Sequence, residues 1–66
     1  MNGLGRYFLN QADKLTDEYH ANRMIGRETP EILKDIQFHI QAAQGRGMET
    51  RTQRKYLEGL RLGKYA

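Results

Sequence analysis

The chain contains no cysteine, no serine, no valine and no tryptophan. Without cysteine there is no disulfide framework, no thiolate zinc site and no cysteine nucleophile. Without serine, the serine acyl-enzyme chemistry of many hydrolases is excluded. No run of alternating β-branched residues is present either, so nothing in the sequence favours a strand. These absences predict an all-α protein.

Long apolar runs are also missing. The longest comprises three residues, Tyr7 to Leu9, whereas a helix that crosses a bilayer needs about 20 consecutive apolar residues. The N-terminus lacks the apolar core of a signal peptide. We therefore expect no contact with a membrane and a cytoplasmic location.

The chain is too short for a large core. Its 66 residues, of which 38% are hydrophobic, make a single domain, and a chain of this size buries only about 60% of its unfolded surface. Dimerisation or docking onto a partner would add stability to such a thin core. A substrate cavity of a few hundred Å³ is hard to build in it. We expect a protein that is not an enzyme and that uses no cofactor, metal or small-molecule substrate.

The segment 29–47 carries the clearest helix signals. Thr29 suits the N-cap and Pro30 suits the first helical position, and the glycines at 45 and 47 suit the end. The spacing predicts a helix over 30–44. Its apolar residues fall within one sector of the helix, which we expect to face the core: Ile32, Leu33, Ile36, Ile40 and Ala43.

Two further helices are predicted, over 4–22 and 51–62. The first rests on apolar residues spaced by three or four, and the second on a capping box formed by Thr50 and Gln53. Met24 and Ile25 are expected to pack under the intervening turn, and residues 63–66 to fray. The predicted fold is a three-helix domain with a core of Phe8, Leu15, Tyr19, Ile32, Ile36, Ile40, Leu57 and Leu60.

Positive charge is concentrated at the C-terminal end. Residues 1–45 hold five Lys/Arg against six Asp/Glu, whereas residues 46–66 hold six against two. The candidates for phosphate contact are Arg46, Arg51, Arg54, Lys55 and Arg61. They suggest a nucleic-acid interface within 46–64. The helices predicted over 30–44 and 51–62 would then form a helix-turn-helix motif, to which the sequence is a weak match. A solvated face, with Glu58 neutralising neighbouring arginines, or a surface for an acidic protein explains them as well.

The two histidines offer weak candidates for chemistry. Asp35 and His39 lie one turn apart with Glu31 before them, a spacing that allows a metal site or an oriented base. A half-buried His39 paired with Asp35 is the commoner outcome of this spacing. His20 has only Asp17 and Glu18 as ligand-like neighbours, so we expect a structural role for it too.

Phe38 is a large apolar residue that falls outside the core face of the central helix. It projects roughly 160° away from Ile36, among polar residues. Either the ends of the chain cover it, or it is one of the lone exposed apolar residues common on proteins, or it anchors an interface. In the last case Lys34 and Ala42, one turn away on either side, would contribute, and the partner would be another protein or a second copy in a homodimer.

These patterns predict a small binding module that acts through protein–protein contacts, as an inhibitor, an adaptor or an accessory factor of the phage or mobile-element type. Phe38 is its candidate interface anchor. The alternative is a nucleic-acid-binding protein that uses the basic C-terminal helix.

Overall fold

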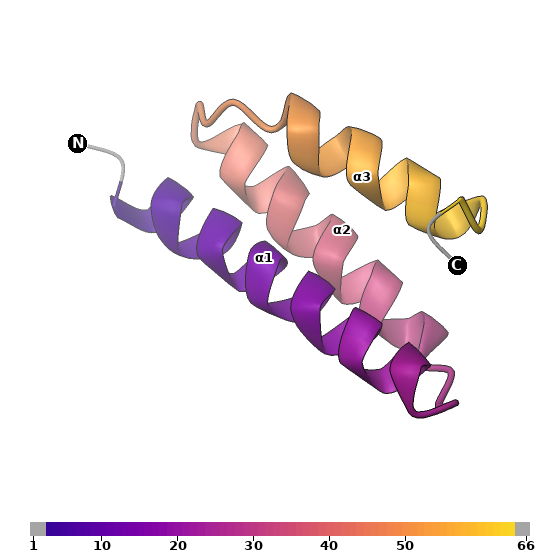
Figure 1. The fold of residues 1–66 in the computed structure, drawn as a ribbon. Helices are drawn as coiled ribbons and strands as arrows, with labels where there is room; N and C mark the ends of the chain where they lie inside the picture. The colour runs from indigo at the N-terminus through magenta and orange to yellow at the C-terminus, as the bar shows by residue number, and fades with distance from the viewer. Residues whose placement is uncertain (1–2, 65–66) are drawn as a thin grey trace.

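The computed structural model describes residues 3–64 and contains three helices: α1 (Gly3–Met24), α2 (Pro30–Gly45) and α3 (Arg51–Arg61). Consecutive helices run in opposite directions, with α2 between the other two (Figure 1). No strand occurs among the described residues. The all-α, three-helix prediction is confirmed.

The helix limits differ from the predicted ones by only one or two residues. α1 begins one residue earlier and ends two later, α2 includes Gly45, and α3 ends before Leu62. Of the two glycines expected to close α2, only Gly47 has a positive φ, +86°. Gly63 and Lys64 form a turn after α3, with Lys64 N–H donating to the Gly59 carbonyl at 2.9 Å. Residues 65–66 lie outside the described residues, so the expected fraying of the C-terminus stays a prediction.

The core lies where the three helices meet. Six of the eight predicted core residues are buried, and they list as Tyr19, Ile32, Ile36, Ile40, Leu57 and Leu60. The other two, Phe8 and Leu15, are only half-buried. Ala12 and Ala43 are also buried, and small residues of this kind allow helix backbones to approach closely. The aliphatic core is thin, as the composition predicts.

The predicted side-chain caps of α2 and α3 are wrong. Neither Thr29 nor Thr50 makes a side-chain capping hydrogen bond. The Thr29 hydroxyl accepts from Asn22 Nδ2 at 3.3 Å, which ties the end of α1 to the start of α2. Thr50 is 1% exposed, and its hydroxyl accepts from Arg54 Nε at 3.1 Å. Each hydroxyl is therefore used by another side chain.

The α1–α2 turn is more open than predicted. Met24 and Ile25, expected to pack beneath it, are 88% and 73% exposed. Gly26, with φ +78°, reverses the chain at once, and Arg27 N–H donates back to the Asn22 carbonyl at 2.9 Å. This glycine-closed helix end satisfies the last carbonyls through the backbone. Met24 and Ile25 therefore lie on the outside of the turn, and their predicted packing beneath it is wrong.

The helices contact one another unequally. α1 packs along α2, α3 packs less extensively on α2, and α1 and α3 contact each other only sparsely. A cleft lies between α1 and α3, and Ile40 of α2 also lines it. Within residues 3–64 no helix is both long and apolar enough to cross a membrane.

Candidate functional site

Four rings form a continuous row across α1 and α2. The centroids of Tyr7 and Phe8 are 5.6 Å apart, those of Phe8 and His39 6.0 Å, and those of His39 and Phe38 5.2 Å. The outer two pairs meet edge to face, a geometry that aromatic rings prefer. We call the surface formed by Tyr7, Phe8, Phe38 and His39 the aromatic face. It joins an α1 pair to an α2 pair.

The two ends of this row are open to solvent. Tyr7 is 53% and Phe38 60% exposed, whereas Phe8 and His39 between them are half-buried. Leu4, one turn before Phe8 on α1, is 54% exposed. Phe38 is therefore left mostly uncovered by the described residues, and it is not an isolated exposed side chain either, because the His39 ring lies against it.

The inner rings are held in place by polar contacts. His39 Nδ1 lies 2.7 Å from the backbone carbonyl of Asp35. Because a carbonyl oxygen only accepts, Nδ1 carries the proton in this bond. The Arg46 guanidinium carbon lies 5.7 Å from the centroid of the Phe8 ring, a cation–π distance. The expected half-buried His39 is present, but it binds the backbone of Asp35, not its carboxylate.

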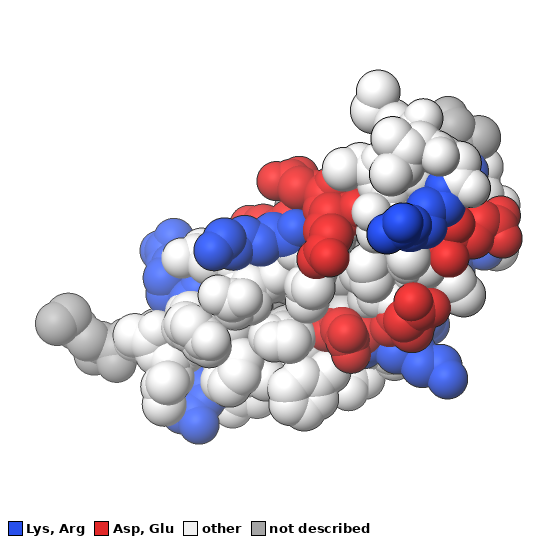
Figure 2. Space-filling view, turned by 90° about the horizontal axis from the view of Figure 1, so that it is seen from below, with Lys and Arg blue, Asp and Glu red and all other residues white. Residues whose placement is uncertain are grey.

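The remaining predicted interface residues, Lys34 and Ala42, flank Phe38 on α2. Lys34 is exposed and Ala42 half-buried. Figure 2, viewed from beneath α1, shows few charged side chains at the end near the N-terminus. Basic side chains border that end, while every acidic side chain visible in this view lies in the middle or toward the other end. The acidic side chains on this side of the molecule are therefore unevenly distributed, whereas basic ones lie at both ends.

The residues predicted for nucleic acid are all exposed, but three of the five are engaged within the chain. Arg46 lies over Phe8, Arg54 donates to Thr50, and an Nη2 of Arg61 donates to Oε1 of Gln37. Arg51 and Lys55 lie on the outer side of α3. Of these three contacts, the one between Arg61 and Gln37 joins α3 to α2.

The arrangement of α2 and α3 gives the helix-turn-helix hypothesis no support. In that motif two helices meet at a steep angle, so that the second helix projects toward a major groove. Here α3 lies alongside α2 in the opposite direction (Figure 1). Residues 46–50 make a hairpin connection between the two helices.

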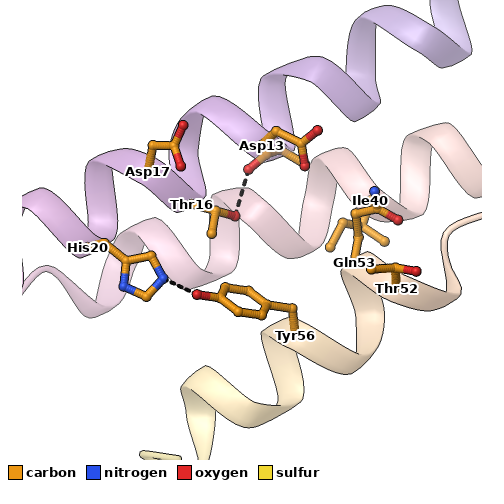
Figure 3. A pocket seen from close by; sticks show the side chains of 9 residues that line it. Asp13, Thr16, Asp17, His20, Ile40, Thr52, Gln53 and Tyr56 are labelled. Atoms are coloured by element: carbon orange, nitrogen blue, oxygen red, sulfur yellow. Dashed lines mark hydrogen bonds between the residues drawn. The ribbon is translucent and has the colours of Figure 1, made fainter. Parts of the chain in front are cut away.

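The cleft between α1 and α3 holds about 280 Å³. Its lining lists as Ala12, Asp13, Thr16, Asp17, His20, Ile40, Thr52, Gln53 and Tyr56. A hydrogen bond between His20 Nε2 and the Tyr56 hydroxyl spans it (Figure 3). The Thr16 hydroxyl donates to the Ala12 carbonyl at 2.8 Å. The imidazole is thus a strut between α1 and α3.

The pKa of two carboxyl groups is shifted. Burial against the cleft wall, together with the nearby Asp17 carboxylate, raises the pKa of Asp13. At the start of α3 the backbone N–H of Arg51 donates to Glu49 Oε1 at 2.7 Å and lowers the pKa of Glu49. Among residues 3–64 no group of three or more potential ligand side chains is placed to hold a metal ion.

Sequence reasoning missed both the partner of His20 and the row of rings. Tyr56 is 36 residues from His20, so no local spacing signals their contact. The pairing of Phe8 with His39 also depends on the register between α1 and α2. Of the exposed rings, the sequence pattern singled out Phe38, because it falls outside the apolar sector of its helix.

No family model matches the chain, and comparisons with curated proteins and with solved structures find no match either.

Proposed function

We propose that this protein is a small non-enzymatic binding module that contacts another protein chain through the aromatic face. The observation that supports this proposal is the row of rings with exposed ends, Tyr7 at 53% and Phe38 at 60%. Aromatic residues are enriched where protein interfaces lose their water, and they supply much of the binding energy there.

The partly buried middle of the row favours binding over accidental exposure. Phe8 and His39 are fixed by neighbouring rings, by Arg46 and by the Asp35 carbonyl. Side chains that are already held in place lose little conformational freedom when a partner covers them. The exposed rings at either end are therefore presented by a rigid base.

A photoreactive benzoylphenylalanine at position 38 tests the proposal. Irradiation of cells that make this protein should give an adduct with one defined protein chain, identified by mass spectrometry. The interaction should then be reconstituted from purified components and lost in Phe38→Glu. The control carries the same probe at position 55, on the outer side of α3. Equal labelling from both positions, or none from position 38, would refute the proposal.

The nucleic-acid alternative rests on the basic residues of α3. If they contact phosphates, affinity for duplex DNA must fall steeply with salt, and replacing Arg51 and Lys55 must flatten that dependence. The engagement of Arg54 and Arg61 with Thr50 and Gln37 makes this the weaker proposal. Binding to DNA that is unaffected by Phe38→Glu would favour it over the aromatic face.

A further inference from the structure

We propose that the cleft between α1 and α3 binds a primary alkylammonium group, held by the carboxylates of Asp13 and Asp17. This inference goes beyond the proposed function and does not depend on the aromatic face. The cleft holds about 280 Å³, just below the range of about 300 to 1,000 Å³ that is usual for small-molecule sites. The ligand is therefore small, or it is a single side chain of a larger molecule.

The two charged residues that line the cleft are both acidic. Asp13 and Asp17 lie one turn apart on α1, about 6 Å along the helix axis. No Lys or Arg of the described residues lines the cleft, although the whole chain carries a net charge of +3. Like charges at this spacing repel each other and weaken a helix. A cation bound between the two carboxylates relieves that repulsion.

The pKa of Asp13 indicates that its negative charge is not compensated by a neighbouring cation. Partial burial raises this pKa, and the Asp17 carboxylate raises it further. A Lys or Arg close by would lower it, but none of the described residues does so. The Asp13 carboxylate is therefore partly withdrawn from water beside a second negative charge. A cation is attracted more strongly there than at an open surface.

An acidic pair on a helix is ordinarily solvated on all sides, but this pair borders a cavity with apolar and aromatic walls. Ala12 and Ile40 line the cleft and are only 1% and 2% exposed. They offer apolar contact to the methylenes of an alkyl chain, which a bare inorganic cation lacks. The Tyr56 side chain extends from α3 toward α1, where its hydroxyl meets His20 (Figure 3). An aromatic ring held in this way attracts a cation placed over its face.

The polar groups of the cleft suit an ammonium group better than a metal ion. Within residues 3–64 no three His, Asp or Glu side chains are grouped to hold a metal. An ammonium group carries three N–H donors and needs only acceptors. Asp13 and Asp17 supply carboxylate oxygens, and Thr52 and Gln53 carry further acceptor oxygens on the α3 side. An alkylammonium therefore matches both the polar and the apolar parts of the lining.

Three probes with the same four-carbon chain test the inference: n-butylammonium, n-butanol and n-butyrate. Each is titrated at neutral pH and constant ionic strength, and the backbone amide signals are followed by NMR. Butylammonium should shift the signals of residues that line the cleft, with saturation at a Kd of about 1 to 10 mM for so small a ligand. Butanol should bind about tenfold more weakly, and butyrate should not bind, because the two carboxylates repel it.

Two double variants separate the cleft from the overall charge. Asp13→Asn with Asp17→Asn removes both carboxylates and keeps the side-chain shapes, so it should weaken butylammonium binding about tenfold or more. Glu18→Gln with Glu28→Gln removes the same amount of charge at two exposed positions that do not line the cleft. This control should leave the Kd unchanged. Circular dichroism shows that each variant is folded.

Three results would overturn the inference. Equal binding of butylammonium and butanol would show that the charge plays no part, and an equal loss in both double variants would reduce the effect to overall charge. The absence of a saturable shift up to about 100 mM would show that the cleft does not bind the group.

Nα-acetyl-lysine methylamide distinguishes the two sources of an alkylammonium group. Binding as tight as that of butylammonium supports a site for a lysine side chain of another chain. Binding about tenfold weaker supports a site for a free amine, because the peptide groups of the probe then hinder entry into the cleft.

Discussion

Ile36 is the residue on which the stability of the fold depends most directly. It is 1% exposed, in the middle of α2, where it faces both neighbouring helices. Ile36→Ala removes three carbon atoms, whose transfer back to water costs about 2.4 kcal/mol at about 0.8 kcal/mol each. A cavity of a few tens of Å³, at about 24 cal/mol per Å³, adds about 1 kcal/mol. The expected loss is therefore about 3 to 4 kcal/mol.

This loss is large beside the total stability of the domain. At about 0.05 to 0.15 kcal/mol per residue, a chain of 66 residues is stable by about 3 to 10 kcal/mol. Urea denaturation followed by circular dichroism should show a midpoint lower by about 2 to 4 M, for a denaturant slope of about 1 to 1.5 kcal/mol per M. At the lower end of the stability range, the variant would be unfolded in buffer.

Leu62→Ala is the matched control. It also removes three carbon atoms, but Leu62 is 64% exposed, so the loss should stay below about 1 kcal/mol. If the two variants lost the same stability, Ile36 would not occupy the packed centre of the helices, and the assignment of the core face of α2 would be wrong.

Three further predictions concern the cleft and the turns. Partial burial raises the pKa of the Asp13 carboxyl, so the folded chain binds the carboxyl proton more tightly than the unfolded chain does, and it loses stability as pH rises through the folded pKa. Asp13→Asn should therefore raise Tm at neutral pH, and an equal gain at a pH below the unfolded pKa would show that the shifted pKa is not the cause. Tyr56→Phe removes the hydrogen bond to His20 and should cost about 1 kcal/mol in urea denaturation, and no loss would mean that the strut is not formed in solution. Gly26→Ala should destabilise the fold by about 1 kcal/mol because φ at this position is +78°, whereas Gly45→Ala, at a helical position, should stabilise it by up to about 1 kcal/mol. If thermal denaturation shifted Tm in the same direction for both variants, the backbone conformation at one of the two glycines would be wrong.

The fold was predictable because its determinants are local. The apolar spacing, Pro30 and the turn glycines each act within a few residues, and they place the three helices to within two residues of their observed limits. The caps were not predictable, because whether Thr29 and Thr50 bind their own helix depends on Asn22 and Arg54 competing for the same hydroxyls.

The candidate site was only partly predictable. Phe38 could be singled out, since a helical wheel shows which side chains leave the core sector. The partners that turn it into a face depend on how far α1 slides along α2, and a helix pattern leaves that offset open. Phe8, with the Tyr7 ring against it, comes to lie beside His39 only through this register.

The sparse contact between α1 and α3 has a consequence for how the chain folds. Each helix packs mainly on the helix next to it in sequence, so most native contacts close short loops. Low contact order of this kind is associated with folding in microseconds to milliseconds. The α1–α2 hairpin holds most of the packing, whereas α3 is fastened by one helix and one strut. In native-state hydrogen exchange, α3 should therefore open as a separate unit at a lower free energy than the hairpin.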